Sequence, residues 1–326
     1  MLTVKENLKE VMSGGKPDRF VKQYEFLQMV MTVPFTRKKP PIGGEIVNEW
    51  GVTVRWPEEQ LGAFPVHDDE HIVVKDITEW KNFVKAPNLD YPDEAWAQAI
   101  ADANAVDREN KYVTAFVAPG LFEHTHYLMR MENALMDFYE EPEAMHELID
   151  YLTEFELKYA KEVTDHIHPD ALFHHDDWGS QISTFLSPAM FEEFFVPAYK
   201  KIYGYWKDHG VELIVHHSDS YAATLVPYMI EMGIDIWQGV MTTNHIPDLI
   251  KQYGGKITFM GGVDSGVIDH PAWSKEQIEK EVTRACRENG KLYFIPSASQ
   301  GLGVSSFPGV YEATDYAIDK MTKEMF

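Results

Sequence analysis

Short hydrophobic runs alternate with amphipathic segments from about residue 112 to the end of the chain. Each run is rich in β-branched or aromatic residues and is bounded by turn residues, which is typical of buried strands, while the segments between the runs have the spacing of helices. The predicted strands are 112–119, 170–175, 211–217, 233–239, 256–262 and 291–296. This alternation indicates βα units around a parallel sheet.

The clearest helical segment spans residues 187–210. Ser187 is a typical N-cap residue, Pro188 suits the first helical position, and Gly210 marks the end of the segment. Pro197 cannot donate a backbone hydrogen bond inside a helix, so we expect it to kink the segment or to divide it into two helices.

The first 110 residues are less regular. Residues 19–26 could form the first strand, 45–59 and 62–74 have the pattern of a hairpin or small sheet, and 93–110 has that of a helix. With residues 19–26 added to the six strands listed above, the predicted barrel has seven strands. An eight-stranded barrel needs one more, and the sequence does not show where that strand lies. We therefore predict an α/β fold, a single distorted (β/α)8 TIM barrel with an irregular N-terminal extension. A doubly wound sheet is the alternative.

No repeat, low-complexity stretch or Gly/Ser linker divides the chain. The 326 residues are 44% hydrophobic, which is enough to bury one large core. We expect one domain over residues 1–326, with an irregular part over 1–110 and regular βα units over 111–326.

The charge balance and the cysteine content narrow the possible partners. The chain has 29 Lys and Arg against 52 Asp and Glu, a formal charge of −23, and this repulsion argues against nucleic acid as a partner. No run approaches the ~18 apolar residues of a membrane span, and the N-terminus has charges where a secretory signal has its apolar core. We expect a cytoplasmic protein with no membrane partner. Because Cys286 is the only thiol, a metal site built by this chain must use His, Asp or Glu.

Polar residues gather where five of the predicted strands end, and in a parallel barrel these ends meet at one mouth. The polar stretches are 120–126, 174–181, 216–220, 261–264 and 296–301. Some of their members have structural explanations. An Asp at a strand end often caps the next helix, which could apply to Asp176 and Asp264. His174 and His216 are expected to be satisfied core residues.

Side chains alternate along a strand, so only one histidine of each adjacent pair should face the barrel axis. His217 and Asp219 project to one side if the strand geometry continues, and the same holds for His175 and Asp177. Two imidazoles and two carboxylates are unfavourable to bury together unless they bind a cation or hydrogen-bond to one another. The sequence is compatible with either explanation of these four side chains, a metal site or a hydrogen-bonded polar cluster.

The chain contains no GxGxxG after a strand, no P-loop, no GxSxG and no HExxH, so the corresponding enzyme classes lack their signatures. Six of its segments match a known family in order and spacing: GKPDRF (15–20), 118–150, 174–204, HGVELIVHHSDS (209–220), MGIDIWQGV (232–240) and FMGGVDS (259–265). They resemble the uroporphyrinogen decarboxylase superfamily, which also contains corrinoid-dependent methyltransferases of methylotrophic and demethylating anaerobes. The resemblance covers nearly the whole chain and implies a single TIM barrel with its site at the C-terminal mouth.

The chain departs from the family patterns in two places, and these departures indicate which branch of the superfamily, decarboxylases or methyltransferases, it resembles more. True decarboxylases carry an arginine-rich N-terminal signature that holds the acidic side chains of the porphyrinogen, whereas residues 17–30 here contain one Arg and one Lys. The methyltransferases resemble the chain better, and in them a His-x-Cys and a second Cys after the last strand hold zinc. Here His217-Ser218-Asp219 stands in the first place, and residues 297–300 contain no thiol. The resemblance implies His217 and, by substitution, Asp219 as ligands, with Asp177 as the nearest candidate for the third.

Replacing thiolates by His and carboxylate leaves zinc, or a similar divalent metal, harder and more electrophilic, and such an ion prefers oxygen. We therefore expect a methyltransferase that moves a methyl group from a small donor, a methoxylated aromatic, to a corrinoid carried by a partner protein. The expected catalytic residues are His217, Asp219 and Asp177. The expected pocket residues are His175, Trp178, His126, Trp237, Asp264 and Gln300. The alternatives are a decarboxylase, a methylcobalamin:thiol methyltransferase and a non-catalytic tetrapyrrole or corrinoid binding protein.

Overall fold

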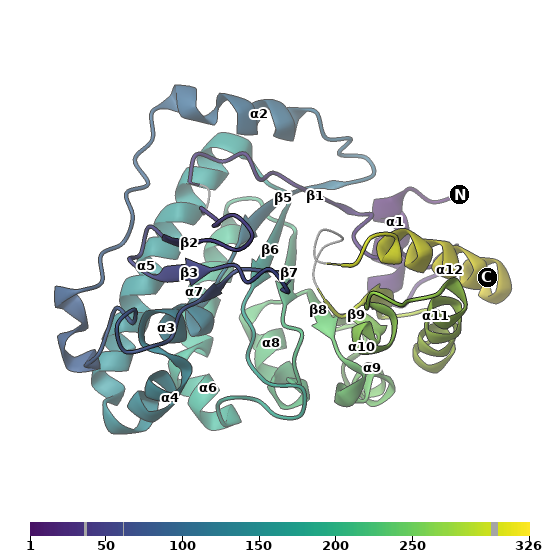
Figure 1. Cartoon of the computed structure of the whole chain (residues 1–326). Helices are drawn as coiled ribbons and strands as arrows, with labels where there is room; N and C mark the ends of the chain where they lie inside the picture. The colour runs from purple at the N-terminus through teal and green to yellow at the C-terminus, as the bar shows by residue number, and fades with distance from the viewer. Residues whose placement is uncertain (36–37, 61, 301–305) are drawn as a thin grey trace.

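Seven parallel strands form one curled sheet in a computed structural model that describes residues 1–35, 38–60, 62–300 and 306–326 (Figure 1). Their order in the sheet is β1-β5-β6-β7-β8-β9-β10. The strands are β1 (Leu27–Met29), β5 (Tyr112–Val117), β6 (Ala171–His175), β7 (Leu213–His217), β8 (Ile236–Val240), β9 (Thr258–Val263) and β10 (Phe294–Ala298). In the described part of the chain, no ladder joins β1 to β10. The predicted α/β architecture is confirmed as a distorted TIM-type barrel that is not closed between its two edge strands.

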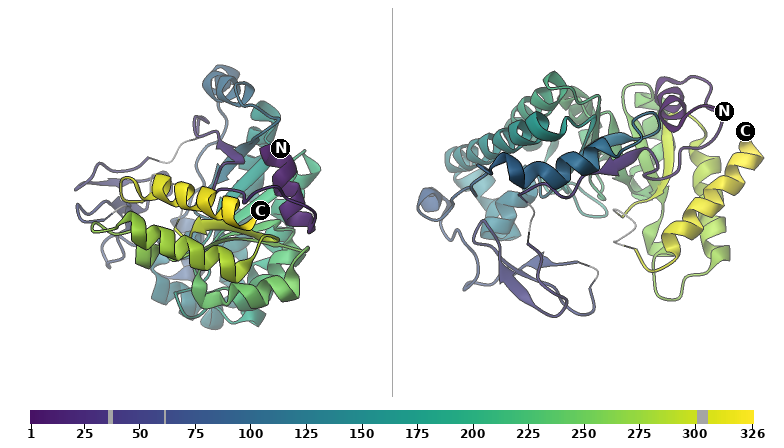
Figure 2. Two further views of the ribbon diagram at one scale, coloured as in Figure 1. Left: turned by 90° about the vertical axis from the view of Figure 1, so that its right-hand side faces the viewer. Right: turned by 90° about the horizontal axis from the view of Figure 1, so that it is seen from above.

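Helices lie around the outside of this sheet, and both chain ends lie on the same side of the molecule (Figures 1 and 2). The helices are α1 (Val4–Ser13), α2 (Ala97–Asn104), α3 (Leu121–Met129), α4 (Met131–Glu140), α5 (Pro142–Ile167), α6 (Pro188–Phe194), α7 (Val196–Asp208), α8 (Val226–Met232), α9 (Ile246–Tyr253), α10 (Ser265–Ile268), α11 (Lys275–Asn289) and α12 (Val310–Met325). Short 3-10 turns are η1 (Ile77–Asn82), η2 (Asp93–Trp96), η3 (Ala223–Leu225) and η4 (Thr242–Asn244). No helix in the described ranges has both the length and the apolar character that a membrane span requires.

A separate three-stranded antiparallel sheet precedes the regular βα units. It consists of β2 (Glu45–Val47), β3 (Thr53–Arg55) and β4 (Phe64–Pro65), in the order β2-β3-β4. Gly51 adopts a φ of 80° in the turn between β2 and β3, a conformation that favours glycine. The small sheet predicted from the sequence is therefore confirmed.

The six strands predicted after residue 112 are all present, with shifts of a few residues at their ends. The strand predicted over residues 19–26 is wrong in position, because the structure places β1 at Leu27–Met29 and a turn at 23–26. Gln23 has a φ of 33°, which strand backbone does not adopt. The segment 187–210 is divided as expected: α6 ends at Phe194, and α7 begins at Val196 with Pro197 in its first turn.

Buried residues form two layers, one between the sheet and the outer helices and one inside the barrel. Leu8 and Val11 of α1 belong to the inner layer, together with the inward residues Phe173 and Val215. The N–H of Tyr293, which precedes β10, donates to the carbonyl of Val11 at 2.9 Å. Helix α1 thus covers the N-terminal ends of the strands, which leaves the C-terminal ends for a functional site.

Candidate functional site

Two histidines end neighbouring strands and face the interior of the barrel. His175 is the last residue of β6 and His217 the last of β7, and the two are partners in the parallel ladder. Their rings stack with centroids 4.4 Å apart and planes 20° apart. Because side chains alternate along a strand, His175 faces the same way as the interior residue Phe173, and His217 the same way as Val215.

The preceding histidines point outward, as expected. His174 Nε2 lies 3.0 Å from Glu156 Oε2 of α5, and both side chains are buried. His216 Nδ1 lies 2.8 Å from the Tyr203 hydroxyl of α7, and its Nε2 lies 3.1 Å from the carbonyl oxygen of Asp176. Burial lowers the pKa of His216 well below its usual range. Both imidazoles are buried core residues that leave the site to His175 and His217; the two nitrogens of His216 have partners, whereas His174 Nδ1 has none among the described residues.

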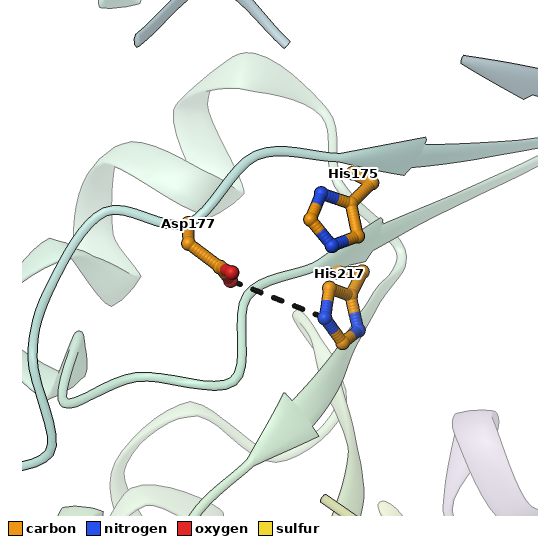
Figure 3. A group of neighbouring side chains, drawn as sticks. All are labelled: His175, Asp177 and His217. Atoms are coloured by element: carbon orange, nitrogen blue, oxygen red, sulfur yellow. Dashed lines mark ion pairs between the residues drawn. The ribbon is translucent and has the colours of Figure 1, made fainter. Parts of the chain in front are cut away.

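Asp177 completes a cluster with the two inward histidines (Figure 3). One ligand atom each from His175, Asp177 and His217 lie within 4.8 Å of one another, and Asp177 Oδ1 is 3.9 Å from His217 Nε2. The N–H of Asp219 donates to the same Asp177 oxygen at 2.9 Å. The three residues lie close enough together that they could hold one divalent metal ion after a small movement of their side chains.

A hydrogen bond to Nδ1 orients each imidazole. His175 Nδ1 lies 2.9 Å from Glu123 Oε2 of α3, and His217 Nδ1 is bonded to Gln238 Oε1 of β8. A carboxylate or an amide oxygen accepts, so each Nδ1 carries its proton and each Nε2 keeps a lone pair whenever the ring is neutral. Metal-binding histidines are typically held in this way by a second partner. Sequence reasoning missed both partners, although Glu123 lies in a polar stretch that the sequence singled out.

The pKa values of the two imidazoles are shifted in opposite directions. Burial lowers the pKa of His175, but the charge and hydrogen bond of Glu123 outweigh burial and raise it to about 10. Burial and the neighbouring His175 charge lower the pKa of His217 to about 4. In the absence of a metal, the site therefore holds a protonated His175 paired with Glu123 beside a neutral His217.

Asp219 lies next to the cluster but is not one of the three residues that converge. Asp219 lies beyond the end of β7, so the alternation of side chains along the strand does not require it to face the same way as His217. Burial and the Asp177 charge raise the pKa of the Asp219 carboxyl to about 8. The structure thus brings His175 into the cluster in the place that the sequence analysis gave to Asp219.

Asp176 anchors the loop that carries Asp177. Its buried carboxylate accepts hydrogen bonds from the backbone N–H groups of Phe122 and Glu123 at 3.0 and 2.8 Å, from Trp178 Nε1 at 2.8 Å and from the Tyr199 hydroxyl. Burial raises the pKa of Asp176 to about 7, while these donors favour the ionised form. Asp176 therefore ties the start of α3 to the end of β6, whereas the next helix along the chain, α6, is capped by Ser187.

Gly120, at the start of α3, packs closely against Asp176. Its N–H donates to the carbonyl of His175 at 2.6 Å, and a Cβ atom added at Gly120 would lie 2.5 Å from the Asp176 Cβ. Only glycine permits this approach of α3 to β6. The contact fixes Glu123, one turn later, beside His175.

The two tryptophans expected in the pocket lie on the outer side of the sheet. Trp178 stacks on His216 at 3.9 Å, and Trp237 is the ladder partner of His216 and donates to the carbonyl of Ser218 at 2.9 Å. Both side chains are at most 2% exposed. The structure places both away from the cluster, because residues in register with His216 face the helices.

The other expected pocket residues lie around the mouth. Asp264 caps α10 by accepting from the Gly266 N–H at 2.9 Å, and the Gln300 N–H donates to Ser265 Oγ at 3.2 Å. His126 is on α3, where burial lowers its pKa to about 3 and the charge of Asp177 opposes that shift.

The fold and the site define an α/β-barrel protein with a polar, metal-competent centre at the carboxyl ends of its strands. The uroporphyrinogen decarboxylase (URO-D) family model matches residues 46–309, and the chain belongs to this family.

The chain is similar in sequence to one curated protein and in fold to one solved structure. The chain is 27% identical over 168 residues to uroporphyrinogen decarboxylase 2, chloroplastic, from Oryza sativa subsp. japonica, which is 52% of this chain and 41% of that protein. The match thus spans less than half of the curated relative. A methyltransferase from Methanosarcina mazei has a similar structure, with a TM-score of 0.65 at 14% identity over 98% of this chain and 99% of that one. This second likeness concerns the fold alone.

Proposed function

We propose that this chain is a methyltransferase that moves a methyl group from an oxygen-linked donor, a methoxylated aromatic, to a corrinoid carried by a partner protein. The observation that supports this proposal best is the donor set of His175, Asp177 and His217 at the mouth of a URO-D barrel. Two nitrogens and one oxygen in place of thiolates favour a hard ion with affinity for oxygen.

The residues present fit a divalent metal of the zinc type. Three protein ligands with further positions left for water or substrate are typical of catalytic zinc. Glu123 and Gln238 already hold His175 and His217 by Nδ1, so each Nε2 is the atom left for a metal. His217 is neutral at pH 7, whereas His175 must first lose a proton.

An ion held by His175, Asp177 and His217 would supply Lewis acidity to an ether oxygen, an effect of roughly several kcal/mol in a dry site. The protein's own residues have the other roles. Asp219 holds Asp177 toward His217 through its N–H, and its carboxyl group lies beside the cluster as a proton source for the departing oxygen. The methyl group passes to the reduced corrinoid as the O–CH3 bond breaks, and the released alcohol or phenol keeps the proton.

The proposal is tested with the purified chain, a cob(I)alamin protein and a methoxyarene, by following the cobalt absorption spectrum. His217→Ala should abolish methylation, because it removes a ligand. His209→Ala, an exposed histidine after α7, is the matched control and should leave the rate unchanged. Unchanged turnover in His217→Ala would remove the role proposed for this residue.

A decarboxylase is the second candidate, because the family model and the curated relative both carry that name. The N-terminal cations do not favour it: Arg19 pairs with Asp18, and Lys22 pairs with Asp319 of α12. An anionic porphyrinogen would gain little from either cation. Conversion of uroporphyrinogen by the purified chain would establish this candidate and exclude the leading one.

A further inference from the structure

A second group of nitrogen-bearing side chains lies at the mouth, beside the candidate metal ligands. His67 follows β4 in the small sheet, while His126 and Arg130 are one turn apart at the end of α3. The rings of His67 and His126 have centroids 6.2 Å apart. The loop that carries His67 is fixed to α3, because the N–H groups of Val73 and Val74 both donate to the Leu128 carbonyl at 3.0 Å.

One nitrogen of each of these three side chains is buried without a hydrogen bond. His67 Nε2, His126 Nδ1 and Arg130 Nε have no partner anywhere in the described ranges of the chain. His126 is only 9% exposed as a whole residue, so solvent reaches it poorly. Buried polar groups are nearly always satisfied in a working protein, and three orphan nitrogens in one place point to a ligand that accepts hydrogen bonds.

The charge of the group defines the ligand further. Burial lowers the pKa of both imidazoles, that of His126 to about 3, and the Arg130 charge lowers that of His67 as well. Both rings are therefore neutral, each with one N–H that can be donated and one nitrogen that accepts, and the fixed positive charge is that of Arg130. Its guanidinium donates to Asp69, whose side chain is 89% exposed, so the ion pair lies on the solvent side. A guanidinium with neutral N–H donors beside it suits a carboxylate.

The surroundings suit an aromatic ring attached to that anion. The half-buried Tyr127 ring lies 5.1 Å from His126, and the Phe122 ring, which stacks on the half-buried Phe185, lies 5.4 Å from it. Glu123, whose carboxylate contacts His175 Nδ1, lies one turn before His126 on α3, so the group borders the proposed metal site.

We propose that His67, His126 and Arg130 form an anion subsite that binds the carboxylate of an aromatic methyl donor and so directs its methoxy oxygen toward His175, Asp177 and His217. This inference rests on the proposed function for the identity of the donor, and it restricts the donor class to methoxylated aromatic acids.

The test compares equilibrium binding of 3-methoxybenzoate with that of its neutral analogue 3-methoxybenzamide by isothermal titration calorimetry. The wild-type chain should bind the acid more tightly. Arg130→Gln should weaken acid binding about tenfold or more and change amide binding less than about twofold. Asp69→Asn removes the competing carboxylate and should strengthen acid binding. Arg287→Gln breaks a comparable surface pair, with Glu324, and is the matched control.

Equal binding of acid and amide by the wild-type chain, or acid binding that neither Arg130→Gln nor Asp69→Asn changes, would overturn the anion subsite. Binding requires no catalysis, so this outcome is distinct from failure of the proposed function. A subsite that binds the acid in a chain that methylates no cob(I)alamin protein would support the inference and contradict the proposed activity. Methyl transfer from neutral methoxyarenes alone would support the proposed activity and contradict the anion subsite.

Discussion

Replacing Glu123 with Gln should change the way in which metal affinity depends on pH. In the wild-type chain His175 Nδ1 lies 2.9 Å from the Glu123 carboxylate, which raises the pKa of the imidazole to about 10. A histidine must be neutral to bind a metal, so binding releases this proton. Below pH 10, the proton on His175 therefore competes with the metal.

The structure sets the size of this competition. At pH 7 the deprotonation of His175 costs up to about 4 kcal/mol, since each pKa unit corresponds to 1.36 kcal/mol. The His175 side chain is 30% exposed, so solvent screening makes this an upper value. Because metal binding releases this one proton, metal affinity should rise about tenfold for each unit by which the pH increases.

Glu123→Gln keeps the size of the side chain and its oxygen acceptor but removes the charge. Burial then dominates, and the pKa of His175 should fall toward or below its ordinary value of 6.5. The slope of log affinity against pH should decrease by about one, while weaker support of the ligand costs about 10 to 100-fold in affinity at high pH.

The assay is a competition titration of zinc against a chelating dye between about pH 6.5 and pH 8.5, a range that lies below the His175 pKa. The matched control is Glu156→Gln, which makes the same change beside the outward-facing His174. The control should keep the wild-type slope. An unchanged slope in Glu123→Gln, or an equal change in both variants, would refute the reasoning.

Three further predictions concern stability. Asp176→Ala leaves four buried donors unsatisfied and should cost about 4 kcal/mol or more in urea unfolding; a loss below about 1 kcal/mol would contradict the anchoring role. Gly120→Ala places a Cβ against Asp176 and should cost about 1–3 kcal/mol in the same assay, whereas a neutral result would show that α3 can shift freely. Burial and nearby carboxylates raise the pKa of Asp137 to about 6, so its ionisation removes stability as the pH rises from about 4 to 6. Asp137→Asn should therefore stabilise the chain at pH 7 by about 1 kcal/mol after solvent screening, and not below about pH 4; equal unfolding curves at pH 7 would contradict this sign.

The period of two along a strand carried most of what the sequence could predict about the site. It separated His175 and His217 from His174 and His216, because a strand with one face toward the axis leaves no other arrangement. This alternation of side chains applies only within a strand. Asp219 lies two residues beyond the end of β7, so the alternation of side chains along the strand did not set its direction.

Contacts between separate strands and helices were beyond the sequence. Glu123 lies 52 residues from His175, and Gln238 lies 21 residues from His217, and nothing local indicates either pairing. The first strand was misplaced for a different reason. Residues 19–26 are as apolar as a strand, but β1 has only three residues, too few to show a period.

Metal analysis of protein purified without chelators tests the central claim most directly. The wild-type chain should contain about one zinc-type ion, and a chain with both His175→Ala and His217→Ala should contain none while it still unfolds cooperatively on heating. A folded wild-type chain that takes up no divalent metal, or a folded double variant that takes up as much as the wild type, would contradict the account.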